Sequence, residues 1–387
     1  MGVPITYNLR NLVERKATTL MTAVGIGLTV AVLVTAMALT DGLDSIFAGS
    51  GDPRQLIVLR KGVDAELSSS VSSESFQIIR RLPGIATDAA GEPLVSPEAM
   101  TVVNLPSVDS PQGMNVSVRG MLPIGLSMRS VEMKQGKKFA PGLRQIIVGE
   151  SIAKRYPDAR IGKQVKFGRG LWEVVGVFQV GESASNSEIW VDLNQLRGDF
   201  EQQGGSSSLL VRAENESALA DLTKSIVDDQ RLGSGVTGEK AYYASMTGAA
   251  KPLQSLGFAV AVIMAIGSAF AATNTMYAAV SRRGREIGTM RALGFGRWDI
   301  LRSFMLESIC LALIGGIFGV LIALPVNGFT TGVGSFVTFS EIAFKFRIGP
   351  KAIFLGLAFA ALIGALGGFL PAWAASKKGI VEAMRDI

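Results

Sequence analysis

Histidine is absent from the 387 residues of this chain, and cysteine occurs once, at Cys310. Without histidine there is no Ser/His/Asp triad, no histidine-containing zinc site and no imidazole to act as a general base. A single cysteine excludes a disulfide within the chain. A phosphate-binding loop of the form G-x-x-x-x-G-K-[ST] is also missing. These absences argue against an enzyme with its own catalytic or metal centre, and energy from ATP would have to come from a partner.

The residues that are present indicate a membrane protein with a large aqueous part. Apolar residues make up 48% of the chain, the mean hydropathy is +0.35 and the formal net charge is +6. Such a chain is too apolar for an ordinary soluble protein and too charged to lie wholly within a membrane. The basic residues cluster beside apolar segments, which favours a role in membrane orientation over binding of nucleic acid.

Four apolar segments are long enough to cross a bilayer as helices, at residues 18–40, 252–280, 303–327 and 350–373. At a rise of about 1.5 Å per residue, about twenty residues match a hydrocarbon core of about 30 Å. The first segment follows basic residues, as in a signal peptide, but it is too long for one and is predicted to span. Before it, apolar residues at helical spacing predict an amphipathic helix over residues 1–17.

The segments that flank these helices predict the orientation of the chain. Lysine and arginine are concentrated near the N-terminus, between the second and third helices at 281–302, and in the tail at 374–387. All three regions fall on one face of the membrane, and the positive-inside rule makes that face cytoplasmic. Both termini are therefore expected in the cytoplasm. The loop at 328–349 and the long segment 41–251 are expected on the other side.

The segment 41–251 has the composition of an aqueous domain and is long enough for one or two compact modules. Short or alternating apolar runs predict strands, and helical spacing predicts helices between them. Strands are predicted at 55–59, 115–118, 145–148, 165–167, 171–180, 188–191 and 208–212, and helices at 73–82, 150–156 and 215–230. The predicted fold is a membrane α-helical protein with four transmembrane helices and a large extracytoplasmic α+β domain inserted between the first and second.

The cytoplasmic link 281–302 combines an apolar stripe with five arginines between residues 282 and 297. Ile287, Met290 and Leu293 recur at roughly helical spacing, and Gly294 supplies a C-terminal stop. A short helix of this kind is suited to contact with another protein. From the residues alone, the alternative is a basic anchor at the membrane surface.

Residues 282–294 read RRGREIGTMRALG and resemble the motif R-x-x-E-I-G-x-x-R-A-L-G of the FtsX/MacB/LolC/LolE family of ABC transporter permeases. The resemblance implies a coupling helix that lies on a separate ATPase subunit. Its coupling residues would be Arg282, Arg285, Glu286, Ile287, Met290, Arg291, Leu293 and Gly294. It also implies that this chain binds no cofactor, because ATP and Mg are bound by a dimer of partner ATPase subunits, and that it lies in a bacterial inner membrane.

The aqueous segment resembles the periplasmic core domain of the same family. Motifs in the family's order are VRGMLP at 118–123, IVGESIA at 147–153, WEVVGVF at 172–178 and EIWV at 188–191. The resemblance implies two subdomains. One is porter-like and built from 54–112 and 206–240, and the other is a β-rich lobe at 113–205.

Small residues in the apolar segments are candidates for close packing between helices. Spacings of four residues or isolated small positions single out Gly25, Gly267, Gly315, Gly319, Gly364 and Gly368. In the third and fourth segments we expect packing within one chain. In the first and second, by resemblance, the alternative is a contact with a second permease copy.

Two polar residues in the apolar segments need a partner or a function. Asn274 lies near the cytoplasmic end of the second segment, and Glu307 lies about one turn into the third. An isolated carboxylate in hydrocarbon costs several kcal/mol. We expect Glu307 to be a snorkelling carboxylate paired with Arg297 or Arg302. The alternative is a hinge contact between the coupling helix and the third helix.

Together these features predict a non-catalytic permease subunit of a mechanotransmission-type ABC transporter. Its expected partners are an ATPase dimer, a second permease copy in a homodimer or heterodimer, membrane lipids, and a periplasmic adaptor with an outer-membrane channel, but no nucleic acid. The expected activity is export or extraction of a lipid, lipoprotein or other envelope substrate. The alternative is an FtsX-like signalling protein that activates a cell-wall hydrolase. A membrane enzyme is disfavoured by the missing histidines.

Overall fold

The computed structural model describes residues 16–108, 110–201, 204–246, 251–334 and 339–378. The chain divides into a helical unit, Met1–Gly42 with Lys251–Phe329 and Lys345–Ile387, and an α/β unit, Leu43–Ala250 with Thr330–Phe344. Most of the predicted amphipathic helix at 1–17 and of the tail at 374–387 lies outside the described residues.

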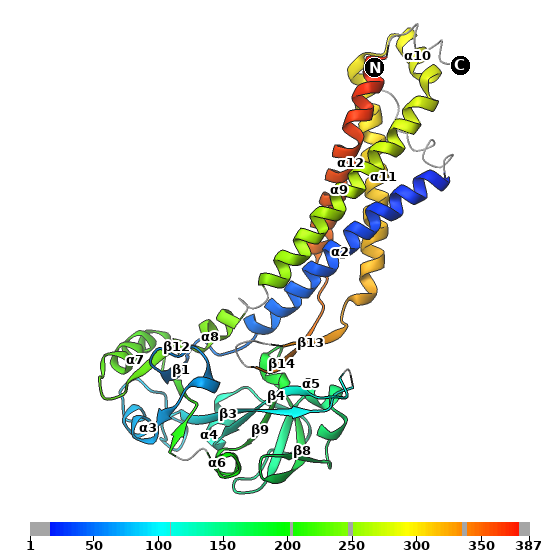
Figure 1. Cartoon of the computed structure of the whole chain (residues 1–387). Helices are drawn as coiled ribbons and strands as arrows, with labels where there is room; N and C mark the ends of the chain where they lie inside the picture. The colour runs from blue at the N-terminus through cyan, green and yellow to red at the C-terminus, as the bar shows by residue number, and fades with distance from the viewer. Residues whose placement is uncertain (1–15, 109, 202–203, 247–250, 335–338, 379–387) are drawn as a thin grey trace. The chain divides into compact units, whose positions relative to one another are not determined.

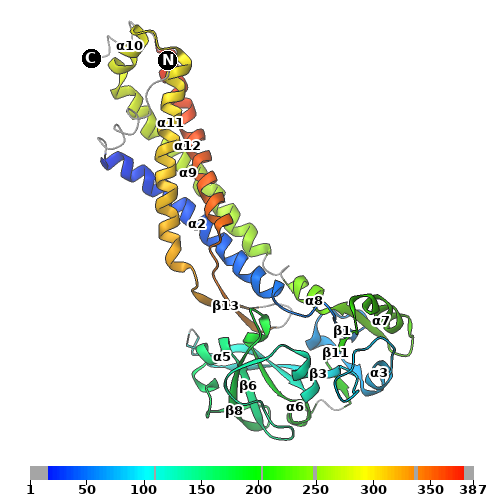
Figure 2. The ribbon, with the colours of Figure 1, turned by 180° about the vertical axis from the view of Figure 1, so that it is seen from behind.

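Within the described residues, four helices are long and apolar enough to cross a membrane. They are α2 (Lys16–Ala48), α9 (Lys251–Arg282), α11 (Arg297–Ala323) and α12 (Pro350–Lys377). Helices α9, α11 and α12 run side by side in both views, and α2 crosses them obliquely (Figures 1 and 2). One precedes the α/β segment and three follow most of it, which confirms the predicted fold class. Helix α2 continues past residue 40 to Ala48, because Asp41 and Asp44 end the apolar run but not the helical hydrogen bonding.

Buried apolar residues of three helices form the core of the helical unit. Ile26, Val30 and Val34 of α2 pack with Ala312 and Val320 of α11 and with Ala360 and Ile363 of α12. Hydroxyl groups add hydrogen bonds between helices, as between Thr29 and Ser268 at 2.7 Å and from Ser308 to the Gly364 carbonyl at 2.7 Å. Such bonds hold helices together in an apolar medium, where water is not a competitor.

The candidate packing glycines fall into two groups. A Cβ at Gly315 would lie 2.7 Å from the Ala23 carbonyl oxygen, and one at Gly319 would clash with the Gly27 carbonyl, so both face α2. A Cβ at Gly364 would lie 2.5 Å from Ala312 Cβ, and one at Gly368 would clash with Ser308, so both face α11. At Gly25 and Gly267 no described atom lies within 4 Å of the added Cβ.

The α/β unit is built on a ten-stranded mixed sheet among the described residues, in the order β12-β1-β11-β3-β4-β9-β6-β8-β5, with β7 paired to β8. The neighbours β4 and β9, and β6 and β8, are parallel. The strands are β1 (Gln55–Arg60), β3 (Val95–Leu105), β4 (Met114–Met121), β5 (Glu132–Gly136), β6 (Gln145–Gly149), β7 (Gln164–Phe167), β8 (Gly170–Gln179), β9 (Glu188–Asp192), β11 (Ser208–Arg212) and β12 (Ser234–Gly238).

Short helices cover this sheet, and several begin at a side-chain cap. Asp192 accepts hydrogen bonds from two backbone N–H groups at the start of α6, and Asn215 accepts one at the start of α7. Helices α3 and α7 lie beside β1 and β12 (Figure 1). The helices are α3 (Ser73–Ile79), α4 (Pro123–Met128), α5 (Glu150–Arg155), α6 (Leu193–Phe200), α7 (Glu216–Asp228) and α8 (Glu239–Met246). A short pair, β2 (Val71–Ser72) with β10 (Gly205–Ser206), lies apart from the main sheet.

The segments expected to form two subdomains share this one sheet. Strands from 54–112 and 206–240 make one end, around a core that includes Leu56, Ile79 and Leu222. Strands from 113–205 make the other end, with separate cores around Trp172 and Trp190. The two ends join where β3 pairs with β4 from Glu98↔Met121 to Leu105↔Met114. The sequence-based prediction missed β3, which contains Pro97, because proline disfavours strands and only the pairing with its neighbours compensates.

The expected loop at 328–349 instead contains a strand pair, β13 (Thr330–Gly334) and β14 (Glu341–Lys345), most of which belongs to the α/β unit. Glu341 accepts hydrogen bonds from Arg155 at 2.6 Å and from Tyr156 at 2.7 Å, and the Ser117 and Ser340 hydroxyls lie 2.7 Å apart. The sequence analysis did not identify these two strands, because the partners of this segment lie far away in the sequence. Each of the four long helices is thus directly connected along the chain to the α/β unit.

Substitution of two glycines tests the helix packing. Gly319→Ala should lower the free energy of unfolding by about 1–3 kcal/mol, because the added methyl group meets backbone that cannot move away. Gly267→Ala is the matched control, and alanine's helix preference should leave stability unchanged or raise it by up to about 1 kcal/mol. Denaturant unfolding of both variants in one detergent measures the difference. Equal destabilisation by the two would contradict the α2–α11 contact.

Candidate functional site

A sharp bend joins α9 to α11 through the short helix α10 (Gly284–Ala292). Arg283 breaks the helical path before α10, with φ −104° and ψ 19°. After α10, Gly294 has φ +95°, Gly294 N–H donates to the Arg291 carbonyl, and Phe295 N–H donates to the Met290 carbonyl. These two bonds close a helix end that requires a left-handed residue, so glycine at 294 fixes where α10 stops.

A buried ion pair holds this bend against α11. The two terminal nitrogens of Arg283 lie 2.7 and 3.0 Å from the two carboxylate oxygens of Glu307. Both residues are 4% exposed, and the guanidinium also lies over the Phe304 ring. The expected pairing of Glu307 with Arg297 or Arg302 is therefore wrong. The two-pronged geometry with Arg283 satisfies both carboxylate oxygens at once and joins the residue before α10 to α11.

The inner face of α10 is apolar and packs on the long helices. Ile287 is fully buried with Met276 and Val280 of α9 and with Ile300 and Phe304 of α11, and Met290 is half-buried against the same cluster. Of the predicted coupling residues, Ile287 and Met290 therefore attach α10 to the long helices rather than forming an exposed contact surface. Helical periodicity identified the stripe, but the bend turns it toward the chain's own helices.

The remaining predicted residues lie on α10 or beside its ends, with Arg282 at the end of α9 and Leu293 and Gly294 directly after α10. Arg282, Arg285, Glu286, Leu293 and Gly294 are exposed, and Arg291 is half-buried. Leu293 is 74% exposed. Trp298, near the start of α11, is 72% exposed and was not among the candidates, although a tryptophan beside a basic motif was a visible signal. Leu293 and Trp298 are thus two exposed large apolar side chains among the arginines of the bend, and tryptophan and arginine are enriched at protein interfaces.

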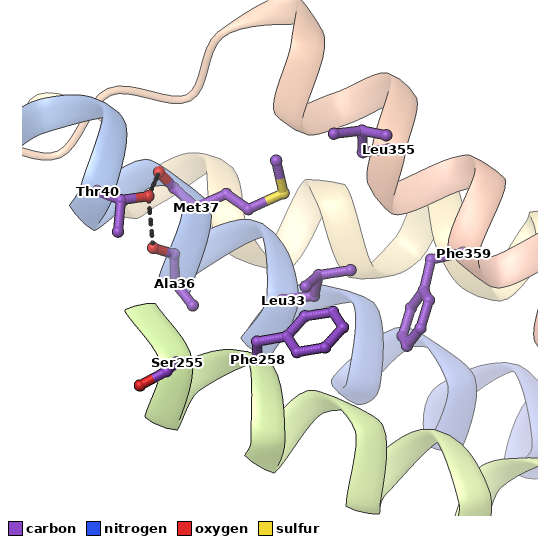
Figure 3. A pocket seen from close by; sticks show the side chains of 8 residues that line it. All are labelled: Leu33, Ala36, Met37, Thr40, Ser255, Phe258, Leu355 and Phe359. Carbon is purple, nitrogen blue, oxygen red and sulfur yellow. Dashed lines mark hydrogen bonds between the residues drawn. The ribbon is translucent and has the colours of Figure 1, made fainter. Parts of the chain in front are cut away.

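A cavity of about 510 Å³ lies among α2, α9 and α12 in the helical unit. Figure 3 shows side chains from all three helices around it. Its lining is apolar apart from two hydroxyl groups, and consists of Leu33, Ala36, Met37, Thr40, Ser255, Phe258, Leu355 and Phe359. A cavity of this size and character suits an apolar group of a small molecule or an acyl chain.

The α/β unit contains a buried charge cluster that the sequence reading did not identify. Arg119 of β4 donates to Glu66, Glu98 and Glu188 at 2.7–3.0 Å, and Arg129 pairs with Glu98 at 2.9 Å. Burial alone would raise the pKa of Glu66, but the charge and hydrogen bonds of Arg119 hold that pKa below its usual value. The available signal was an arginine in the middle of an apolar strand, VSVRGM.

The described residues contain no group of three or more His, Cys, Asp or Glu side chains arranged to hold a metal ion. The acidic residues around Arg119 are engaged with guanidinium groups.

Two family models match the chain. The MacB-like periplasmic core domain matches residues 19–228, and the FtsX-like permease C-terminal domain matches residues 258–380. The first covers more than half of the chain, and the second includes the bend and α10.

Curated relatives match most of the chain at low identity. The macrolide export ATP-binding/permease protein MacB of Agrobacterium fabrum is 26% identical over 389 residues, with 91% of this chain and 58% of the relative covered. The protein of the same name from Shewanella oneidensis is 26% identical over 382 residues, with 88% and 57% covered. The chain thus spans less than three fifths of the length of these relatives.

A solved extracellular domain of the ABC-type transporter YknZ, from Gram-positive bacteria, is similar over 48% of this chain and 100% of its own length. Its sequence identity is 16% and its TM-score is 0.37, which is too distant a likeness to support a conclusion.

Removal of Glu307 tests the buried pair. Glu307→Ala leaves the Arg283 charge buried without its partner, so the free energy of unfolding should fall by about 3–5 kcal/mol. Arg302→Ala, at an exposed site, should change it by less than about 0.5 kcal/mol. The double variant Arg283→Met/Glu307→Leu should recover most of the loss, because no charge remains buried. Unfolding in detergent measures all three, and equal losses from Glu307→Ala and Arg302→Ala would contradict this pairing.

Proposed function

Since this chain belongs to the family of ABC transporter permeases that combine a MacB-like periplasmic core domain with an FtsX-like permease domain, we propose that it is a permease subunit driven by a partner ATPase. The ATPase binds ATP and Mg, and this chain performs no catalysis of its own. It couples nucleotide hydrolysis to a conformational change of the α/β unit.

The observation that carries the proposal is the way α10 is held. Its inner face is fixed by the Ile287 cluster, and its N-terminus is fixed by the Arg283–Glu307 pair. Arg285 of its outer face and Leu293, directly after its last residue, are exposed. A partner that pushes on the outer face therefore displaces α9 and α11 together with α10. Only a partner whose contacts differ between nucleotide states can drive such a change.

The basic residues support an orientation in the bacterial inner membrane. Exposed arginines at 282, 285 and 297 flank the bend, and the positive-inside rule assigns them to the cytoplasm, where the ATPase dimer would bind. Both termini would then be cytoplasmic and the α/β unit periplasmic. The open faces at Gly25 and Gly267 leave room for a second permease copy, in a homodimer or a heterodimer.

The cavity of the helical unit supports an apolar or amphiphilic substrate. Its lining of leucine, methionine and phenylalanine would accept a lipid, the acyl chain of a lipoprotein, or an apolar drug. The relatives are named for macrolide export, a transport activity. We therefore propose export or extraction of such a molecule, with a periplasmic adaptor and an outer-membrane channel as further partners.

Truncation of the exposed apolar residues tests the coupling surface. The double variant Leu293→Ala/Trp298→Ala should weaken binding of the purified ATPase subunit to the permease in nanodiscs by about thirtyfold or more, as loss of a central apolar anchor implies. Leu366→Ala is the control, because Leu366 is 62% exposed on α12, away from the bend. Biolayer interferometry gives both affinities. Wild-type affinity in the double variant would rule out this face as the ATPase contact.

Obstruction of the cavity tests the substrate class. Met37→Trp places a large ring among the lining side chains of Figure 3, whereas Leu256→Trp changes a 63% exposed residue that does not line the cavity. We expect Met37→Trp to weaken binding of a fluorescent phospholipid analogue and of a macrolide by about tenfold or more, and Leu256→Trp to have little effect. Fluorescence titration in nanodiscs measures both. If wild-type protein binds neither probe but its loss abolishes activation of a cell-wall hydrolase, the signalling alternative replaces transport.

A further inference from the structure

Helix α2 leads into the α/β unit through a tight turn, Gly49-Ser50-Gly51-Asp52. A Cβ at Gly49 would clash with the Glu182 carbonyl. Gly51 has φ +82°, and a Cβ there would lie 3.0 Å from the backbone of Glu239. Both glycines therefore allow the chain to touch other backbone segments, and a side chain at either position would separate them.

The Ser50 hydroxyl links the end of α2 to a distant segment. It donates to the Ile46 carbonyl of the last helical turn at 2.7 Å, and it accepts from the Ala184 N–H at 3.0 Å. Ser50 is 1% exposed, so water does not compete for either bond. One hydroxyl group thus connects α2 with the segment 181–188, which joins β8 to β9.

The segment 181–188 reads GESASNSE, yet Ser183–Ser187 are all less than 9% exposed. Its polar groups bond in several directions. Asn186 accepts from the Val180 N–H at 2.8 Å, Ser187 accepts from the Ala343 N–H of β14 at 2.9 Å, and Glu188 accepts from Arg119 at 2.9 Å. Such a fully bonded buried network is stiff, because displacing one member breaks several bonds.

The other side of the turn contacts the start of α8. The Asp52 N–H donates to the Glu239 carboxylate at 2.8 Å, and the Asp52 carboxylate pairs with Arg212 at 3.0 Å. Burial raises the pKa of Glu239. Helix α8 precedes α9 in the chain. The turn therefore follows the end of α2 and also contacts the helix that comes before α9.

We propose that Ser50 is a positioning residue through which displacement of α2 reaches the segment 181–188, and from there β14 and the Arg119 cluster. This inference rests on the proposed function, since the displacement originates at the ATPase. The close backbone contact at Gly49 leaves no free space between the end of α2 and residues 182–184. The Ser50 hydroxyl is hydrogen-bonded to both segments. Movement at the helix end is thereby passed to β9 in the centre of the sheet, and to the strand that leads back to α12.

Hydrogen exchange in the intact complex tests the proposal. The probe is the permease with its co-purified ATPase in nanodiscs, compared without nucleotide and with ATP plus vanadate. In wild-type protein we expect a nucleotide-dependent change in exchange in peptides covering α10, 181–192 and 341–345. In Ser50→Ala the change at α10 should remain, whereas those at 181–192 and 341–345 should fall about three- to tenfold, as the loss of one hydrogen bond implies.

Two further variants keep the outcome interpretable. Thr223→Ala removes a hydroxyl bond to the carbonyl four residues earlier, as Ser50→Ala does, but without a contact to a second segment, and it should respond like wild type. Gly49→Ala should act like Ser50→Ala by forcing α2 away from Glu182. Exchange in β1 and β11 reports whether each variant is folded.

The possible failures are distinguishable. If α10 responds and Ser50→Ala and Gly49→Ala both transmit the full change to 181–192, the role of Ser50 is wrong and the proposed function stands. If wild-type protein shows no nucleotide-dependent change even at α10, the proposed function fails, and the inference fails with it.

Discussion

The Arg283–Glu307 ion pair holds together the bend that joins α9 to α11 in the helical unit. Two charges are buried among apolar side chains, and each is tolerated only because the other satisfies it with two hydrogen bonds. Arg283 lies between α9 and α10, while Glu307 belongs to α11. The pair therefore ties three helices at one point, and the buried Ile287 cluster extends this attachment along α10. A short helix of little intrinsic stability becomes a rigid part of the long ones.

The α/β unit uses the same principle. Arg119 is surrounded by three glutamates from different elements, and the polar residues 183–188 are buried, several of them with hydrogen bonds to other segments. Loss of any partner would leave a buried polar group unsatisfied, so these networks favour one arrangement strongly. The pairing of β3 with β4 makes the sheet continuous from one end of the α/β unit to the other.

Much of this architecture follows from local patterns in the sequence. The apolar runs predicted the four long helices, and alternating residues predicted strands such as β1, β8 and β11. The motif at 282–294 indicated the family and predicted the position of α10. Patterns failed where context decides: β3 contains a proline, β13 and β14 have weak signals, and Ile287 on the predicted contact stripe faces inward.

The sequence by itself determined which segments are apolar, that the short helix α10 ends before Gly294, and which residues share a helical face. These features depend on neighbours a few residues apart. The tertiary structure alone decided the partners. Glu307 pairs with Arg283, 24 residues away, rather than with the nearer Arg302, and Arg119 joins glutamates from three separate elements. Periodicity fixes the direction of a side chain, whereas its partner depends on how distant segments pack.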